Sequence, residues 1–163
     1  MVEKQKLEKK IGEVLGLEIS AQKSIEQLSS KGLLDNAKVN KDKIEEIKKE
    51  AADHQRRIEQ VITRLSQAQG FDSQMILKEA DETVQRATQM MDIYLKGHEE
   101  PTTALEFLCQ AEVGEVTHYE LLKNMAGQQV NDQTLLSEVR SILDEEKQHL
   151  QECIQAAKES VGQ

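Results

Sequence analysis

Two stretches of the sequence decide the fold: Glu112–Met125, EVGEVTHYELLKNM, and Asp144–Leu150, DEEKQHL. Each contains Glu-x-x-His, as Glu115 with His118 and as Glu146 with His149. At about 100° per residue the apolar residues around each motif form one stripe, and both glutamates fall near its middle. A carboxylate on a buried stripe costs free energy unless it has a partner, a proton or a metal ion. The two stretches therefore predict amphipathic helices with acidic groups on their buried faces.

The composition predicts an all-α protein. The chain has 163 residues, one proline and eight glycines, and it is rich in residues that favour helix. No run of alternating valine and isoleucine would suit a strand. We expect one domain, residues 1–163, since the length suits a single core. The helices are expected over Glu3–Ser29, from the cap Asn40 to before Gly70, over Asp72–Lys96, from Pro101 to Gly127, and from the cap Asn131 or Asp132 to Glu159.

Charge and cysteine content argue against several classes of protein. The net charge of −9 and the pI near 5.0 disfavour a nucleic-acid partner, since phosphate binding draws on a cationic surface. No run of about 18 apolar residues and no signal-peptide pattern is present, so we expect no membrane span and a cytoplasmic location. Two cysteines are too few for a disulfide framework. The lack of Cys-x-x-Cys pairs excludes a built-in rubredoxin-type iron module.

The first two helices repeat the pattern of charged groups on an apolar stripe. Glu18 lies in the middle of the first stripe, and His54 lies inside the second. Glu50 is about 40° from His54 around the helix, so it could reach the same interior. Gly12 and Gly16, four residues apart in the first helix, would permit a close approach of another helix.

The third helix differs, because its acidic residues fall on a solvated face. Its predicted inner face consists of Ile76, Ala80, Thr83, Ala87, Met90, Met91 and Tyr94. At roughly 37 Å it is long enough to carry the chain back along a bundle.

Four helices thus place candidate ligands on buried stripes: Glu18; Glu50 and His54; Glu112, Glu115 and His118; Glu146 and His149. Oxygen ligands with one imidazole per ion suit iron or manganese, and a carboxylate can bridge two ions. Each residue also has a plainer interpretation: a lone Glu-x-x-His in a Glu-rich helix is more often solvated, and a lone buried histidine is more often a core residue. His118 lies about 80° from its stripe centre, which fits a bundle edge as well as a ligand. We expect the remaining acids near these motifs to be solvated: Asp53, Glu120, Asp144, Glu145 and Glu152.

Two segments resemble the last two bundle helices of the ferritin-like superfamily, in particular its rubrerythrin and YciE-type branches. They are AEVGEVTHYELL (111–122) and LDEEKQHLQE (143–152). EAADHQRRIEQVITRL (50–65) resembles the second YciE-type helix, and Glu18 occupies the place of the first-helix glutamate. Two features depart from the family pattern: Ala51 stands three residues before His54, where a glutamate is usual, and His118 is an additional histidine.

The resemblance implies a ferritin-like four-helix bundle with an additional long crossover helix, and two iron or manganese ions in its core. The ligands would be Glu18, Glu50, His54, Glu112, Glu115, His118, Glu146 and His149, with Tyr119 as a supporting hydrogen-bond donor. The implied activity is oxidation of iron by oxygen or peroxide, or reduction of peroxide with an external electron donor, in an oxidative-stress setting. It also implies a homodimer. Two alternatives stay open: a non-catalytic stress-associated bundle with a degenerate or empty site, and a structural interaction protein whose buried Glu and His residues pair with one another.

Overall fold

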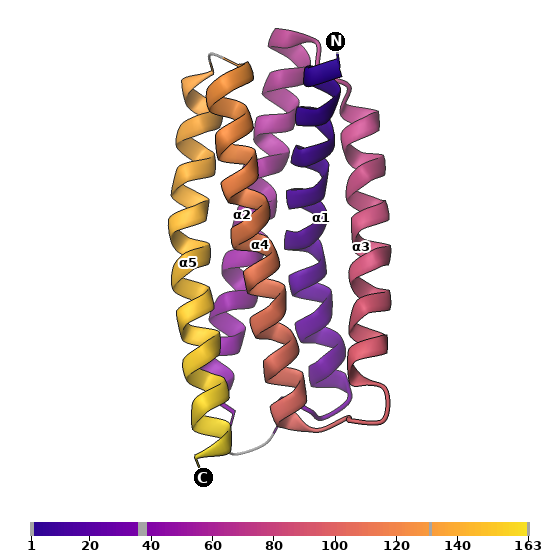
Figure 1. Cartoon of the computed structure of the whole chain (residues 1–163), viewed down its shortest axis with the longest axis vertical. Helices are drawn as coiled ribbons and strands as arrows, with labels where there is room; N and C mark the ends of the chain where they lie inside the picture. The colour runs from indigo at the N-terminus through magenta and orange to yellow at the C-terminus, as the bar shows by residue number, and fades with distance from the viewer. Residues whose placement is uncertain (1, 36–38, 131, 163) are drawn as a thin grey trace.

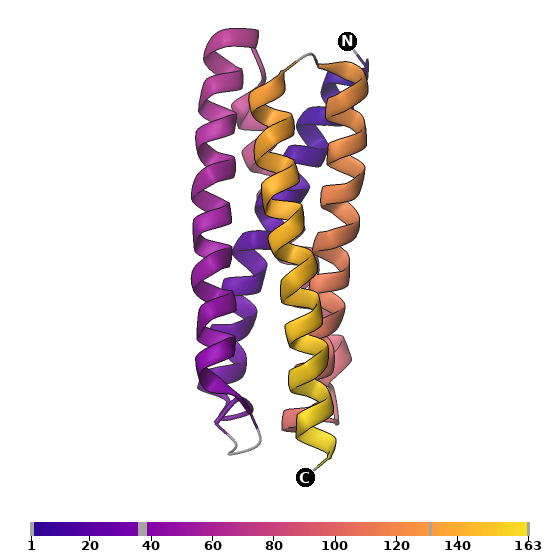
Figure 2. The same cartoon turned by 90° about the vertical axis from the view of Figure 1, so that its left-hand side faces the viewer.

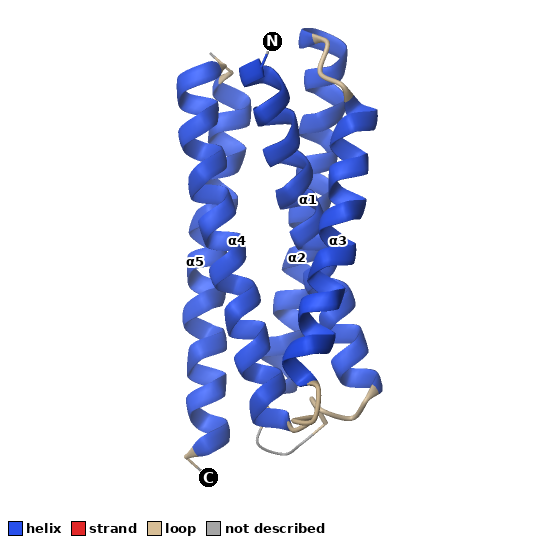
Figure 3. Cartoon of the chain, turned by 45° about the vertical axis from the view of Figure 1, so that its right-hand side comes forward, coloured by secondary structure: helices blue, strands red, loops and turns tan. Residues whose placement is uncertain are grey.

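The computed structural model describes residues 2–35, 39–130 and 132–162 of the chain, and within these residues it is all helical and contains no strand (Figure 3). The helices are α1 (Val2–Ser30), α2 (Lys41–Gln69), α3 (Ser73–Leu95), α4 (Pro101–Gln129) and α5 (Gln133–Val161). They run lengthwise beside one another, and each points opposite to the helix before it in the chain (Figure 1 and Figure 2). The predicted all-α class is confirmed. None of the described helices combines the length and apolar character that a membrane span requires.

Capping residues set most of the helix ends near the predicted positions. The Asn40 side chain accepts a hydrogen bond from the backbone N–H of Lys43 at 3.2 Å, and Gly70 ends α2 with a φ of 63°. The Asp132 side chain caps α5 by accepting from the backbone N–H of Leu135 at 2.9 Å, while Asn131, the other predicted cap, lies outside the described residues. Two helices continue slightly past their predicted ends: α4 passes Gly127 and ends at Gln129, and α5 passes Glu159 and ends at Val161.

The predicted close approach at Gly12 and Gly16 is confirmed, and its partner is α3. A Cβ atom on Gly12 would lie 2.5 Å from the backbone oxygen of Ile76. A Cβ atom on Gly16 would lie 2.6 Å from the backbone oxygen of Ala80. Only glycine lets the two backbones pack this closely, and α3 therefore lies against α1 on the outside of the molecule (Figure 1).

The predicted inner face of α3 was wrong at Met90, whose side chain is 65% exposed. Because α3 packs mainly against α1, it buries only a narrow face. Met91, which was also predicted to face inward, is buried, and Leu95 joins it in the core at this level.

The buried apolar residues form two clusters, one toward each end of the molecule. The first includes Leu15, Ile58 and Ile142. The second includes Leu28, Leu105 and Cys153. On each of α1, α2, α4 and α5 the predicted acidic and imidazole groups fall between these clusters in the sequence. The fold therefore places a polar layer between two dry cores.

Candidate metal centre

Six ionisable side chains make up the polar layer, and none is more than 4% exposed. They are Glu18 of α1, His54 of α2, Glu112 and Glu115 of α4, and Glu146 and His149 of α5. All six were predicted from the sequence to lie on buried stripes. Their burial follows from helical periodicity, since each shares a face with the apolar residues one turn away.

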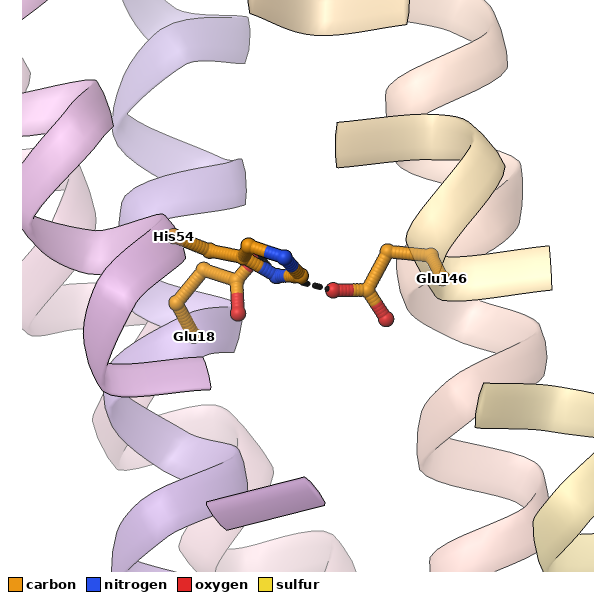
Figure 4. Close-up of side chains that lie close together, drawn as sticks. All are labelled: Glu18, His54 and Glu146. Atoms are coloured by element: carbon orange, nitrogen blue, oxygen red, sulfur yellow. Dashed lines mark hydrogen bonds and ion pairs between the residues drawn. The ribbon is translucent and has the colours of Figure 1, made fainter. Parts of the chain in front are cut away.

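The first group of potential ligands joins three helices. The Nδ1 atom of His54 lies 2.6 Å from Oε1 of Glu146 and 3.3 Å from Oε1 of Glu18. Figure 4 shows Glu18 and His54 facing Glu146, which approaches from the opposite side on α5. One ligand atom from each of the three lies within 4.8 Å of the other two, so the three could hold one cation.

The second group shares Glu146 with the first. The Nδ1 atom of His149 lies 3.4 Å from Oε2 of Glu146 and 3.9 Å from Oε2 of Glu112. These three residues also offer ligand atoms within 4.8 Å of one another. The rings of His54 and His149 stack with centroids 5.6 Å apart. Glu146 thus directs one oxygen toward each imidazole, as a carboxylate bridging two ions must.

Outer carboxylates hold both imidazoles from the other side. The Nε2 atom of His54 lies 2.6 Å from Oε2 of Glu145, and the Arg57 guanidinium donates to that same oxygen at 3.0 Å. The Nε2 atom of His149 contacts Oε2 of Glu50. A carboxylate behind a ligating histidine fixes the tautomer and orientation of its ring.

These contacts change the roles predicted for two glutamates. Glu145 was expected to be solvated, but its 44% exposed side chain bonds to His54. Glu50 was expected to be a metal ligand beside His54, but its 43% exposed side chain is on the outer side of His149. Sequence periodicity misses such pairings, because they depend on how one helix is rotated against another.

His118 does not join the layer. Its side chain is 33% exposed, and its Nδ1 atom lies 3.2 Å from both Oε2 of Glu13 and Nζ of Lys10. Burial and the neighbouring Lys10 charge lower its pKa. Its angular offset from the α4 stripe places it at the edge of the molecule, and the structure favours that interpretation over a ligand.

Tyr119 is fully buried and donates its O–H to Oε1 of Glu18 at 2.6 Å. Tyr119 was predicted as a hydrogen-bond donor beside a metal ligand, and this is the hydrogen bond that such a role would use.

Four buried carboxylate oxygens in the layer have no hydrogen-bond partner: Oε2 of Glu18, Oε2 of Glu112, Oε1 of Glu115 and Oε2 of Glu146. Orphaned buried polar atoms are uncommon because each is costly. A set of carboxylates with one imidazole in each group matches the ligands that iron and manganese take in proteins. The residues present therefore fit a pair of such ions.

The electrostatics of the layer favour either protons or cations. Burial and the charge of Glu146 raise the pKa of Glu18 to about 8 and the pKa values of Glu112 and Glu115 well above their ordinary range. Burial also opposes ionisation of Glu146, but its contacts with His149 and His54 outweigh burial and lower its pKa to about 2.

Both histidines are affected by the same charges. Burial lowers the pKa of His54, but Glu146 and Glu18 outweigh it and raise that pKa to about 11. Burial also lowers the pKa of His149, but Glu146 and Glu50 outweigh burial and raise that pKa to about 9. A cation entering the layer would take the place of the protons that these groups hold.

Comparison of the chain with models of protein families, with curated proteins and with solved structures found no match.

Proposed function

We propose that this protein is a ferritin-like metal-binding protein with a carboxylate and histidine site for two iron or manganese ions. In this proposal α1, α2, α4 and α5 form the bundle, and α3 is the crossover helix that returns the chain between α2 and α4. The observation that carries the proposal is the set of four orphaned carboxylate oxygens in one layer with two imidazoles. Among the described residues no hydrogen bond reaches these oxygens; the nearest contacts are those of His149 Nδ1 with Oε2 of Glu146 at 3.4 Å and with Oε2 of Glu112 at 3.9 Å.

The ligand groups of the structure suggest how the ions would be shared. Glu18, His54 and Glu146 would hold one ion, and Glu112, Glu146 and His149 the other. Glu115, buried beside them with an unpaired oxygen, is available to either. Glu50 and Glu145 would orient the imidazoles, and Tyr119 would orient Glu18.

Two iron ions held there as Fe(II) would supply two electrons and Lewis acidity for the reduction of oxygen or peroxide, and would themselves be oxidised to Fe(III). The chain contributes a dry layer between two apolar cores. In the metal-free layer, burial and the charge of Glu146 raise the pKa values of Glu18, Glu112 and Glu115, so these carboxyls hold protons that bound cations would displace. Peroxide reduction would draw on an external electron donor.

Replacing the shared carboxylate tests the proposal. Glu146→Ala should abolish oxygen-dependent oxidation of Fe(II), followed as loss of Fe(II) reactive toward a colorimetric chelator. Asp144→Ala is the matched control, because Asp144 lies in the same turn of α5 but is exposed. Wild-type rates in the Glu146 variant would overturn the assignment.

One observation favours a second candidate, a non-catalytic bundle without metal. Both imidazoles already have carboxylate partners, His54 in Glu145 and Glu146 and His149 in Glu50 and Glu146, so the layer could be a network of ion pairs. A ligand that binds only the folded state raises its stability. If the protein binds metal, chelation should therefore lower its melting temperature; no change would favour the second candidate.

A further inference from the structure

The two cysteines of the chain lie together, although 44 positions separate Cys109 from Cys153. They belong to facing, antiparallel helices. Lys147 of α5 donates to Glu120 of α4 at 2.7 Å, and Glu112 of α4 lies near His149 of α5. The next turn along this register brings Cys109 and Cys153 beside one another, so that each thiol shifts the pKa of the other, and both side chains pack in the same apolar cluster.

The two thiols differ in their access to solvent. Cys153 is only 2% exposed, whereas Cys109 is half-buried. Cys109 also lines a surface hollow of about 450 Å³ between α3, α4 and α5, beside Tyr94, Gln110 and Ile154. A small molecule could therefore reach Cys109 from solvent, whereas Cys153 is buried and does not line the hollow.

We propose that Cys109 and Cys153 form a redox site in which hydrogen peroxide oxidises the dithiol to a disulfide joining α4 to α5. The site rests on these two residues and their packing, and it is independent of the proposed metal centre.

The reaction balances with peroxide as the only oxidant. The Cys109 sulfur attacks one peroxide oxygen, the O–O bond breaks, and Cys109 becomes a sulfenic acid while hydroxide leaves and takes a proton to form water. The Cys153 sulfur then attacks the Cys109 sulfur, the S–O bond breaks, and a second water leaves with the Cys153 proton. Two thiols and one hydrogen peroxide give one disulfide and two waters, with two electrons passed from sulfur to oxygen.

The contact between the thiols suits these two roles. The neighbouring Cys153 thiol lowers the pKa of Cys109 although burial opposes it. The Cys109 thiol, together with burial, raises the pKa of Cys153. The attacking thiol is thus the more accessible and more acidic of the two, as is typical of peroxide-sensing cysteines with a resolving partner. A low-molecular-weight thiol entering the hollow at Cys109 could reduce the bond again.

The pair lies one helical turn from the polar layer. Cys109 precedes Glu112 by three residues, and Cys153 follows His149 by four. A disulfide here would fix α4 against α5 at that turn. Oxidation would therefore change the rigidity of the two helices that carry four of the six ionisable residues of the polar layer.

The test uses the full chain, reduced and treated with chelator, so that the metal centre takes no part. Hydrogen peroxide is added in about one equivalent per chain, and free thiols are counted with a chromogenic disulfide reagent while intact mass is recorded under non-reducing conditions. The wild-type protein should lose both thiols, lose the mass of two hydrogens, remain monomeric on a denaturing gel, and recover on reduction.

Two variants separate the roles of the cysteines. Cys153→Ala should leave a sulfenic acid on Cys109 that a dimedone probe traps. Cys109→Ser should keep Cys153 reduced under the same treatment, because no accessible thiol remains. Circular dichroism confirms that each variant is folded. Wild-type protein that keeps both thiols, or that forms only disulfides between chains, would overturn the proposal; loss of Fe(II) oxidation alone would not affect it.

Discussion

Glu146 of α5 lies between the two buried histidines: its Oε1 is 2.6 Å from Nδ1 of His54, and its Oε2 is 3.4 Å from Nδ1 of His149. This single carboxylate therefore belongs to both groups of potential ligands. It also keeps the lowest pKa in the layer, about 2, because both imidazoles stabilise its charge. It is the residue on which the account of the site depends most.

The two histidines of the Glu-x-x-His motifs should behave differently when removed. His149→Ala takes away a ligand of the proposed site, and we expect the affinity for Mn(II) to fall by more than the roughly 10–100-fold that loss of a supporting residue costs. His118→Ala should leave the affinity unchanged, because His118 pairs with Glu13 at the edge of the molecule. Equilibrium dialysis with Mn(II) measures both, and equal losses in the two variants would contradict the ligand assignment.

The two tyrosines of the chain offer a matched pair for the supporting hydrogen bond. Tyr119→Phe removes the buried donor to Glu18, and we expect the metal affinity to fall by about 10–100-fold with unchanged stoichiometry. Tyr94→Phe removes a hydroxyl whose contact with Glu106, at 3.3 Å, is exposed, and it should have no effect. Calorimetric titration with Mn(II) measures the affinity and stoichiometry of both variants. An unaltered affinity in Tyr119→Phe would show that its hydroxyl does not support a ligand.

The stability of the metal-free protein should depend on pH, and bound metal should remove this dependence. In the folded protein the pKa of Glu18 rises from 4.5 to about 8, and that of His149 from 6.5 to about 9. Groups with raised folded pKa values favour the folded state at low pH, and their contribution is lost as pH rises through those values. The melting temperature of the chelated protein should therefore fall from about pH 5 to about pH 9.

Bound metal removes this dependence, because the cations replace the protons. With Mn(II) present, the gain in melting temperature should be largest near the upper end of this pH range. The pKa of Glu146 is lowered from 4.5 to about 2, so its charge stabilises the folded state above pH 4.5 and this contribution is lost on acidification. Both the chelated and the Mn(II)-bound protein should therefore lose stability in strong acid. A melting temperature of the chelated protein that rises from about pH 5 to about pH 9 would contradict the charge assignments.

The packing of α3 on α1 can be tested at one glycine. Gly16→Ala would place a Cβ 2.6 Å from both the backbone oxygen of Ala80 and Cβ of Thr83, and overpacking of this kind destabilises by about 1–3 kcal/mol. Gly114→Ala in α4 meets nothing within 4 Å and should stabilise by about 0.5–1 kcal/mol through helix propensity. Urea unfolding gives both values. Stabilisation by Gly16→Ala would mean that the two helices are further apart.

The burial of the six layer residues could be predicted from the sequence because it depends on one helix at a time. An angular position on a stripe, as for Glu115 or Glu146, follows from periodicity alone. The close approach at Gly12 and Gly16 could be predicted for the same reason, although its partner, α3, could not.

The pairings across helices could not be predicted, since they depend on the rotation and register of one helix against another. This is why Glu145 was missed as a partner of His54, and why Glu50 lies on His149 instead of beside His54. Met90 shows the same limit: its own helix has an inner stripe, but the narrow contact of α3 with α1 leaves it exposed. The contact between Cys109 and Cys153 likewise required the register of α4 and α5.

The most direct test of the proposed dimetal site is an anaerobic equilibrium titration with Fe(II), which measures stoichiometry before any chemistry occurs. We predict saturation at about two ions per chain in the wild-type protein, as in bundles with paired metal ligands on facing helices. The Glu146→Ala variant should lose binding at both positions, because it removes the carboxylate common to the two groups. Binding of no ion by the wild-type chain, or of two ions by the variant, would contradict the account.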